Sequence, residues 1–221
     1  MTDSMEIFVD IHTHQLENQN YYSIINFDLQ QAEKFLSTDT SFFCSIGIHP
    51  WKVASITKEE VFQLKKWEND SRWIAVGECG LDKNSKASLT LQQYFFEKQI
   101  TLSEKLKKPL IIHCVKCFNE IIEIKKNLNP NQKWIIHGFR GKPQLAIQLL
   151  NNDIGISYGE KFNPQSVEIT PFEQLYVETD ESKLPISEIY QRIALVKHCA
   201  VTKLNAGKKL LDLKENNNLL I

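Results

Sequence analysis

Eight short apolar runs, separated by segments of a different periodicity, dominate the sequence. The runs are rich in β-branched and aromatic residues and read IFVDI, YYSIINF, FFCSIGI, WIAVG, PLIIH, KWIIH, DIGISY and LYVETD. Between most of them apolar residues recur every three or four positions, which predicts helices at Leu29–Leu36, Lys58–Trp67, Leu91–Leu106, Phe118–Leu128 and Pro143–Leu150. This alternation is typical of parallel strands joined by helical crossovers.

The number of strand and helix units favours a closed barrel. Nearly continuous apolar strands are expected where both faces of a parallel sheet are covered, and eight units predict an α/β fold of the (β/α)8 TIM-barrel type. The alternative is an open doubly wound sheet, but no strand is followed by a GxGxxG or GxxxxGK[ST] phosphate loop. The chain of 221 residues is short for a barrel, so we expect a compact single domain over 1–221, with a loop rather than a full helix at Lys161–Phe172.

Composition limits the classes of protein that need considering. The chain is 42% hydrophobic and 24% charged, and it has no apolar run long enough to span a bilayer, so we expect no membrane association. The segment MTDSMEIFVD lacks the pattern of an export signal, and we expect a cytoplasmic protein whose five scattered cysteines are reduced. A formal net charge of −1 gives no overall attraction to a polyanion, so nucleic-acid binding would need a local patch or bound cations.

Residues of the type that bind metal ions lie where the predicted strands end. Five of the six histidines are at or just past a strand end, and two acidic residues close further strands. The carboxyl ends of barrel strands converge on one rim, where active sites are found. The residues expected there are His12, His14, His49, Glu78, His113, His137 and Asp180. His198 is expected on a helix, without a functional role.

The pair His12 and His14 has a specific geometric meaning. Residues two apart on an extended strand point to the same side, so one ion can accept both imidazoles. Imidazoles and carboxylates together suit Zn, Mn or Mg, and a carboxylate between two ions can bridge them. Each histidine taken alone could instead be an ordinary hydrogen-bonded residue, and Glu78 or Asp180 could be a helix cap or an ion-pair partner. Their common rim favours metal binding.

Six motifs in this order, VDIHTH, SIGIHPW, AVGECGLD, KPLIIHC, WIIHGF and VETD, resemble the TatD family of metal-dependent deoxyribonucleases. The resemblance runs from His12 to Asp180 and implies an amidohydrolase-like barrel with two divalent ions. It implies that His12 and His14 bind one ion, that Glu78 bridges, and that His113 and His137 bind the second.

The same resemblance implies that Asp180 completes the site and orients the attacking water, and that His49 contacts a substrate phosphate. The chain departs from the family pattern at positions near the substrate. It reads Gln15-Leu16-Glu17 after HxH, Cys114-Val115-Lys116 after the fifth-strand histidine and Glu181-Ser182 after the last acid.

Three further residues are weaker candidates. Arg140 and Lys116, on loops of the same rim, are expected to contact an anionic substrate, although they could be ordinary solvated charges. Trp51 is the candidate for stacking on a base, against simple loop packing. The CxxC formed by Cys114 and Cys117 has no second cysteine pair, and we expect it to have no redox or zinc role.

The sequence therefore predicts a hydrolase that uses two divalent ions (Mg, Mn or Zn) to cleave phosphodiester bonds of DNA or of another phosphodiester, with Asp180 and Glu78 as catalytic residues. One alternative is a hydrolase of small-molecule amides or esters, suggested by the changed substrate loops. Another is a metal-binding protein without turnover, which the presence of both acids disfavours. No obligate protein partner is indicated.

Overall fold

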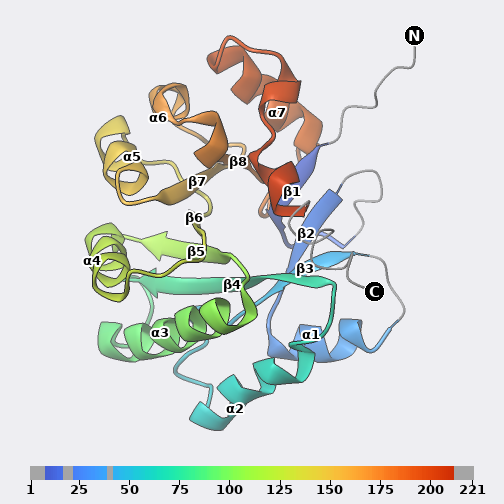
Figure 1. The fold of residues 1–221 in the computed structure, drawn as a ribbon, viewed down its shortest axis with the longest axis vertical. Coiled ribbons are helices and arrows are strands. Elements are labelled where there is room, and N and C mark those ends of the chain that lie inside the picture. Colours follow the sequence, from blue (N-terminus) through green and yellow to red (C-terminus); the bar gives the residue numbers. More distant parts are fainter. Residues whose placement is uncertain (1–7, 17–21, 39–41, 212–221) are drawn as a thin grey trace.

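The strands form one curled sheet in a computed structural model that describes residues 8–16, 22–38 and 42–211. All neighbouring strands are parallel and follow chain order. They are β1 (Val9–Thr13), β2 (Tyr22–Phe27), β3 (Phe43–Ile46), β4 (Trp73–Asp82), β5 (Leu110–Val115), β6 (Trp134–Ile136), β7 (Ile154–Tyr158) and β8 (Leu175–Val177). The sheet brings β8 round to β1 (Figure 1).

The barrel closes between the first and last strands. An isolated parallel bridge joins Thr13 to Asp180. The amide of Asp180 donates to the carbonyl of His12 at 2.9 Å, and the amide of His14 donates to the carbonyl of Asp180 at 3.3 Å. The prediction of a (β/α)8 barrel is therefore confirmed, with a closure that depends on a few contacts near the metal-ligand candidates.

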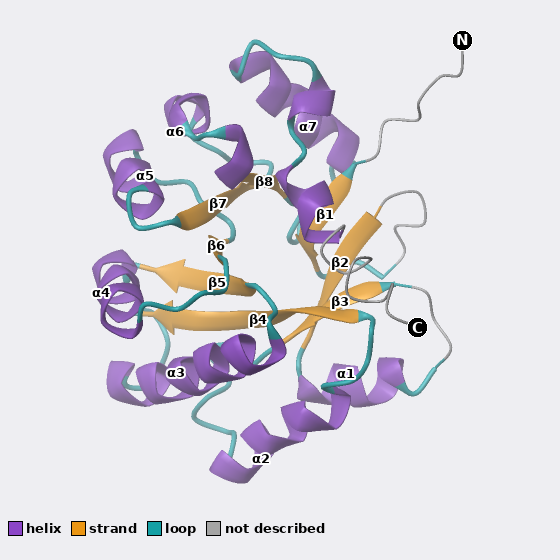
Figure 2. Cartoon of the chain, in the orientation of Figure 1, coloured by secondary structure: helices purple, strands orange, loops and turns teal. Residues whose placement is uncertain are grey.

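Helices lie around the outside of the sheet (Figure 2). The named elements are α1 (Leu29–Leu36), α2 (Lys58–Gln63), α3 (Leu89–Leu106), α4 (Phe118–Leu128), α5 (Pro143–Leu150), α6 (Pro164–Ile169) and α7 (Ile186–Val196), with 3-10 turns η1 (Leu64–Trp67), η2 (Phe172–Gln174) and η3 (Val201–Lys203). Residues 206–211 are helical as well. All five segments with helical spacing are confirmed, and α1, α4 and α5 have the predicted bounds. None of the helices within the described ranges has the length and apolar character needed to cross a membrane.

Three local expectations were wrong. The segment Lys161–Phe172 contains the short helix α6, because Asn163 accepts hydrogen bonds from the amides of the first turn and Pro164 has a backbone angle suited to a helix start. His198 lies in the turn after α7, with φ of 48°, and not on a helix. The strand that contains WIAVG does not end before Glu78 but continues to Asp82. The sequence tail from Lys214 lies outside the described residues.

Glycine explains why β4 can continue past Glu78. Gly80 has φ of 137° and pairs with His113 of β5, and a Cβ at Gly80 would lie 2.1 Å from the His113 carbonyl oxygen. A Cβ at Gly77 would similarly lie 2.5 Å from the carbonyl oxygen of Ile111. The close approach of these two strands therefore requires glycine at both positions. It places Glu78 beside the histidine of the neighbouring strand.

Apolar side chains fill the barrel interior below the carboxyl ends of the strands, whereas polar side chains lie at the carboxyl rim itself. An inner cluster includes Ile111, Ile135 and Tyr176, whereas their strand neighbours pack in the larger outer cluster under the helices. Residues two apart on a strand share a face, so His113 and His137 follow Ile111 and Ile135 on the inner side. The histidines thus form a polar layer above an apolar layer.

Candidate metal centre

Six candidate ligands converge at the carboxyl rim although they come from five strands. His12 and His14 belong to or follow β1, Glu78 lies within β4, His113 lies on β5, and His137 and Asp180 follow β6 and β8. Parallel strands in a closed barrel all end at the same rim. Residues up to 168 positions apart in sequence are thereby placed within a few ångströms of one another.

Glu78 lies at the centre of the cluster. Its Oε1 is 2.8 Å from Nδ1 of His113, 2.8 Å from Nε2 of His137 and 3.3 Å from Nε2 of His49. Its Oε2 faces the other way, 3.7 Å from Nε2 of His12. Burial by itself would raise the pKa of Glu78, but the surrounding histidines outweigh it and hold the pKa well below its usual range. The carboxylate is therefore ionised, with one oxygen toward each group of imidazoles.

Asp180 completes the group around the first strand. Its Oδ1 is 3.8 Å from Nε2 of His12 and 3.6 Å from Nε2 of His14, which is also 3.8 Å from Oε2 of Glu78. The side chain of Asp180 is 29% exposed, so this is the open side of the cluster. Two imidazoles and two carboxylates thus surround one point, and the two groups share Glu78.

His12 provides the strongest indication of a cation. It is completely buried, and neither ring nitrogen has a hydrogen-bond partner within the described part of the chain. Burial and then the neighbouring His137 hold the pKa of His12 well below its ordinary value, so the ring is neutral and its lone pair is available. A buried polar group without a partner costs about 1–3 kcal/mol. A divalent cation next to His12 would remove that cost, and the donor set fits one.

The cluster offers ligand sets for more than one ion. Among the described residues, four triads have ligand atoms within 4.8 Å of one another, namely His12–His14–Asp180, His12–Glu78–His137, His49–Glu78–His113 and His137–Glu178–Asp180. Glu78 belongs to two of them, and Asp180 to two. Overlapping sets that share a carboxylate are the arrangement expected of two neighbouring ions.

Two further carboxylates, Asp82 and Glu178, lie behind the histidines and are not among the residues expected from the sequence. Oδ2 of Asp82 is 3.1 Å from Nε2 of His113, and Oε1 of Glu178 is 3.6 Å from Nδ1 of His137. In both rings the opposite nitrogen faces Glu78. A carboxylate on the far nitrogen of a ligating histidine fixes the ring and its tautomer. Asp82 is the last residue of β4, in AVGECGLD, and Glu178 directly follows β8, in VETD, so the same search for acids at strand ends could have found both.

Glu178 also affects the charge state of His137. Burial would lower the pKa of His137, but the carboxylates of Glu78 and Glu178 hold it well above the ordinary value. Glu178 is fully buried, and its Oε1 accepts a hydrogen bond of 2.6 Å from the amide of Gly138. The negative charge that favours a proton on His137 would equally favour a cation beside it.

His49 has a different hydrogen-bond pattern. Its Nδ1 accepts a hydrogen bond of 3.1 Å from the backbone amide of Trp51. A neutral imidazole that accepts at Nδ1 carries its hydrogen on Nε2, the atom that faces Glu78 at 3.3 Å. An N–H suits a carboxylate or a phosphate oxygen and offers no lone pair to a cation, so in the triad His49–Glu78–His113 only Glu78 and His113 can bind an ion. His49 is thus arranged as a donor, unlike His12.

The two basic candidates lie on rim loops. Arg140 is exposed and lines a cavity of about 250 Å³ together with Lys161, Glu178 and Asp180. Lys116, also exposed, follows β5, and its Nζ donates a hydrogen bond of 3.2 Å to Oδ1 of Asn84. Arg140 is therefore adjacent to the acidic side of the cluster, whereas Lys116 is engaged with a neighbouring loop.

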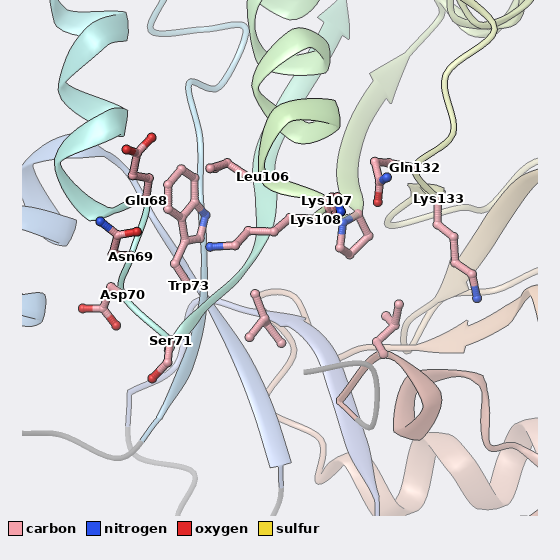
Figure 3. A pocket seen from close by; sticks show the side chains of 13 residues that line it. Glu68, Asn69, Asp70, Ser71, Trp73, Leu106, Lys107, Lys108, Gln132 and Lys133 are labelled. Carbon is pink, nitrogen blue, oxygen red and sulfur yellow. The ribbon is translucent and has the colours of Figure 1, made fainter. Parts of the chain in front are cut away.

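A larger cavity lies at the other end of the barrel. It has a volume of about 380 Å³ and is lined by Trp73 at the start of β4, Pro109 just before β5 and Lys133 just before β6 (Figure 3). These are the amino ends of the strands, opposite the carboxyl ends that carry the histidines. This cavity is therefore separate from the candidate metal centre.

The cysteines take no part in the cluster. All five are free, and neither Cys114 nor Cys117 belongs to a metal-ligand group of the described residues. Burial raises the pKa of both thiols above the ordinary value. The thiolate, which is the form that binds metal and attacks disulfides, is therefore disfavoured at both positions.

Comparisons with known proteins agree with this geometry. The family model "TatD related DNase" matches residues 7–213. An uncharacterized metal-dependent hydrolase of Buchnera aphidicola is 32% identical over 68% of this chain and 60% of its own length. A 3'-5' ssDNA/RNA exonuclease TatD of Erwinia tasmaniensis is 30% identical over 61% of this chain and 56% of its own length. The chain thus spans less than two thirds of either relative.

The fold has a close counterpart among solved structures. The crystal structure of YJJV, a TatD homologue from Escherichia coli, superposes with a TM-score of 0.78 over 93% of this chain and 95% of that one, at 16% sequence identity. That similarity supports the fold, while the family model supports descent over nearly the whole chain. The chain belongs to the TatD related DNase family.

Proposed function

We propose that the chain is a divalent-metal-dependent phosphodiesterase that hydrolyses DNA. The observation that carries this proposal is the position of Glu78, whose two oxygens face two separate groups of imidazoles. The open side of the cluster carries Asp180, and the donor His49 lies close to the Oε1 side of Glu78. Relatives named as metal-dependent hydrolases and nucleases support the same class of reaction.

The proposed site holds two ions. His12, His14 and Asp180 would hold one. His113 and His137, whose ring nitrogens both face Oε1 of Glu78, would hold the second, and Glu78 would serve both groups. Divalent cations such as Mg, Mn or Zn supply the positive charge that the oxygens of a phosphodiester require during attack and departure. Local cations also explain how a chain with a net charge of −1 could bind a polyanion.

Asp180 is the proposed general base. Burial raises the pKa of its carboxyl above the ordinary value, which makes the carboxylate a better proton acceptor than a solvated one. Its backbone has φ of 54° and is fixed by hydrogen bonds to the backbones of His12 and His14. Asp180 therefore accepts the proton of the attacking water from a fixed position at the open side of the cluster.

His49 and Arg140 are the proposed substrate contacts. The Nε2–H of His49 can donate to a non-bridging phosphate oxygen, because its Nδ1 is engaged by the Trp51 amide. The guanidinium of Arg140 lines the rim cavity next to Asp180, where it can pair with a phosphate. Lys116 is a more distant contact, and it would reach a longer strand on the β5 side of the rim.

The proposed setting is the cytoplasm, where DNA is the proposed partner. Five free thiols, three of them buried in the described structure, agree with a reducing compartment. None of them is needed by the proposed chemistry.

A hydrolase of small amides or esters is the second candidate. Two positions that depart from the family pattern, Gln15 and Ser182, contact each other, since the Gln15 side-chain amide donates to the Ser182 carbonyl. The altered loops after β1 and β8, which are neighbours where the barrel closes, are therefore joined by this hydrogen bond. Loops that differ from the family pattern, next to metal-ligand candidates that follow it, would fit a hydrolase that acts on a different substrate.

One experiment tests both candidates. Chelator-treated protein is reloaded with Mg, Mn or Zn and incubated with labelled single-stranded DNA, a generic phosphodiester and a panel of amides and esters. The Asp180→Asn variant, purified in parallel, controls for contaminating nucleases. Metal-dependent DNA cleavage that disappears in the variant is the expected result. Turnover of carbonyl substrates without DNA cleavage would overturn the proposal in favour of the second candidate.

A further inference from the structure

Trp51 differs from the other tryptophans of the chain. It is 63% exposed, whereas Trp67, Trp73 and Trp134 are at most 7% exposed. A tryptophan that served only to pack its loop would bury most of its large apolar surface. Trp51 instead leaves its ring open at the rim, two residues after His49.

The ring is nevertheless held firmly. Its indole Nε1–H donates a hydrogen bond of 2.6 Å to Oδ2 of Asp82, a carboxylate that is 1% exposed. The ring also packs edge to face against His49, with centroids 5.3 Å apart, and lies 6.4 Å from the ring of His113. The indole nitrogen therefore has a hydrogen-bond partner, and the ring is already fixed in orientation in the absence of a ligand. This reduces the conformational entropy that is lost on binding.

We propose that Trp51 is a stacking platform for the base of the nucleotide next to the cleaved phosphate. This inference rests on the proposed nuclease function. The backbone amide of Trp51 fixes the tautomer of His49, and the side chain of Trp51 presents a π surface beside it. One short segment thus offers a phosphate donor and a base contact whose ring centroids are 5.3 Å apart.

The platform has a definite specificity. Stacking on an aromatic ring is worth about 1–3 kcal/mol per base and depends little on which base is present. The indole N–H is occupied by Asp82 and does not select a base edge. Trp51 therefore favours strands that carry a base over those that lack one, without reading sequence.

Fluorescence can detect the stacking directly, because Trp51 supplies the exposed indole while the three other tryptophans are buried. The Asp180→Asn protein with Mg is titrated with a short single-stranded oligonucleotide, which this variant should bind without cleaving. Two matched oligonucleotides lack the base of the terminal nucleotide, one at the 3′ end and one at the 5′ end. Quenching should be strong with the complete strand and weak with one of the abasic strands.

Substitutions in the same background separate stacking from other effects. Trp51→Ala should weaken binding of the complete strand by about 5- to 150-fold, the range that corresponds to 1–3 kcal/mol. It should weaken binding of the sensitive abasic strand much less, and Trp51→Phe should retain most of the affinity. Phe62→Ala is the control, since Phe62 is 62% exposed on α2, outside the barrel.

Several results would overturn the inference. Equal weakening of complete and abasic strands by Trp51→Ala would mean that Trp51 contacts the backbone or merely supports Asp82. If removal of either terminal base left the quenching unchanged, the stacking inference would be wrong, although the proposed nuclease function would still stand. Base-dependent quenching in a protein whose parent form cleaves no DNA would reject the nuclease function but retain the platform. Absence of binding to every strand, together with absence of cleavage by the parent protein, would reject both.

Discussion

Asp82→Asn should weaken metal binding although Asp82 belongs to none of the predicted ligand sets. Three donors converge on its carboxylate. Oδ2 accepts from the indole of Trp51 at 2.6 Å and faces Nε2 of His113 at 3.1 Å, while Oδ1 accepts from the amide of Asn84 at 2.7 Å. Asparagine presents one oxygen and one NH2 group, so at least one of these donors must face another donor.

The size of the effect follows from what Asp82 does for His113. Burial would raise the pKa of Asp82, but these hydrogen bonds, from the Asn84 amide, His113 and Trp51, hold it below the ordinary value, so the residue is ionised. Loss of a carboxylate behind a ligating histidine typically costs about 10- to 100-fold in metal affinity or activity. That corresponds to about 1.4–2.8 kcal/mol of binding free energy.

Calorimetric titration of chelator-treated protein with Zn or Mn measures this directly. The matched control is Asp70→Asn, which also removes a carboxylate that accepts hydrogen bonds from a backbone amide and a side chain, both of Arg72. Asp70 lies before the start of β4, at the end of the barrel away from the histidines, and its loss should leave metal affinity unchanged. A dissociation constant for Asp82→Asn within about twofold of the parent, with unchanged thermal stability of the metal-free proteins, would refute the reasoning.

Three further predictions concern the ligands, the backbone and the thiols. Asp180→Asn should lower turnover by about 10²–10⁴-fold while keeping much of the bound metal, whereas His12→Ala should lower metal occupancy and recover in part with added metal. Near-parental rates for Asp180→Asn at saturating metal would contradict its role as a base. Gly80→Ala should lower the free energy of unfolding by more than about 3 kcal/mol, measured by denaturant titration, because its Cβ would meet the His113 carbonyl. Replacing Cys114 and Cys117 together with serine should leave metal content nearly unchanged by elemental analysis, and loss of metal would reveal a role for the CxxC.

The arrangement of the candidate ligands was predictable because it depends on topology more than on detail. A run such as PLIIH is recognisable as a buried strand, and its terminal histidine must then lie at the carboxyl rim. The same holds for KWIIH and His137. Errors of one or two residues in a strand boundary do not move such a residue to the other end of the barrel. This is why widely separated motifs could be assembled into one site.

Other features depend on backbone geometry that periodicity does not encode. Glu78 was expected to end a strand, but Gly77 and Gly80 let β4 pass close to β5 and continue to Asp82. The left-handed backbone of Asp180 likewise breaks the simple alternation after Val177, so its side chain could not be oriented relative to Glu178. The sequence indicated which charged residues lie at the rim, but only the structure shows in which direction each side chain points.

Asp82 connects the two parts of the proposed site. A base on Trp51 and a cation at His113 would both depend on the same carboxylate oxygen. That oxygen has little freedom, because the backbone of Asp82 is held in both directions by the buried side chain of Gln92, which accepts from its amide and donates to its carbonyl. The amide of Asn84 fixes the other oxygen. Asp82 should therefore set the distance between base and metal as a rigid spacer, and a strand would be selected by whether its base and phosphate fit that distance together.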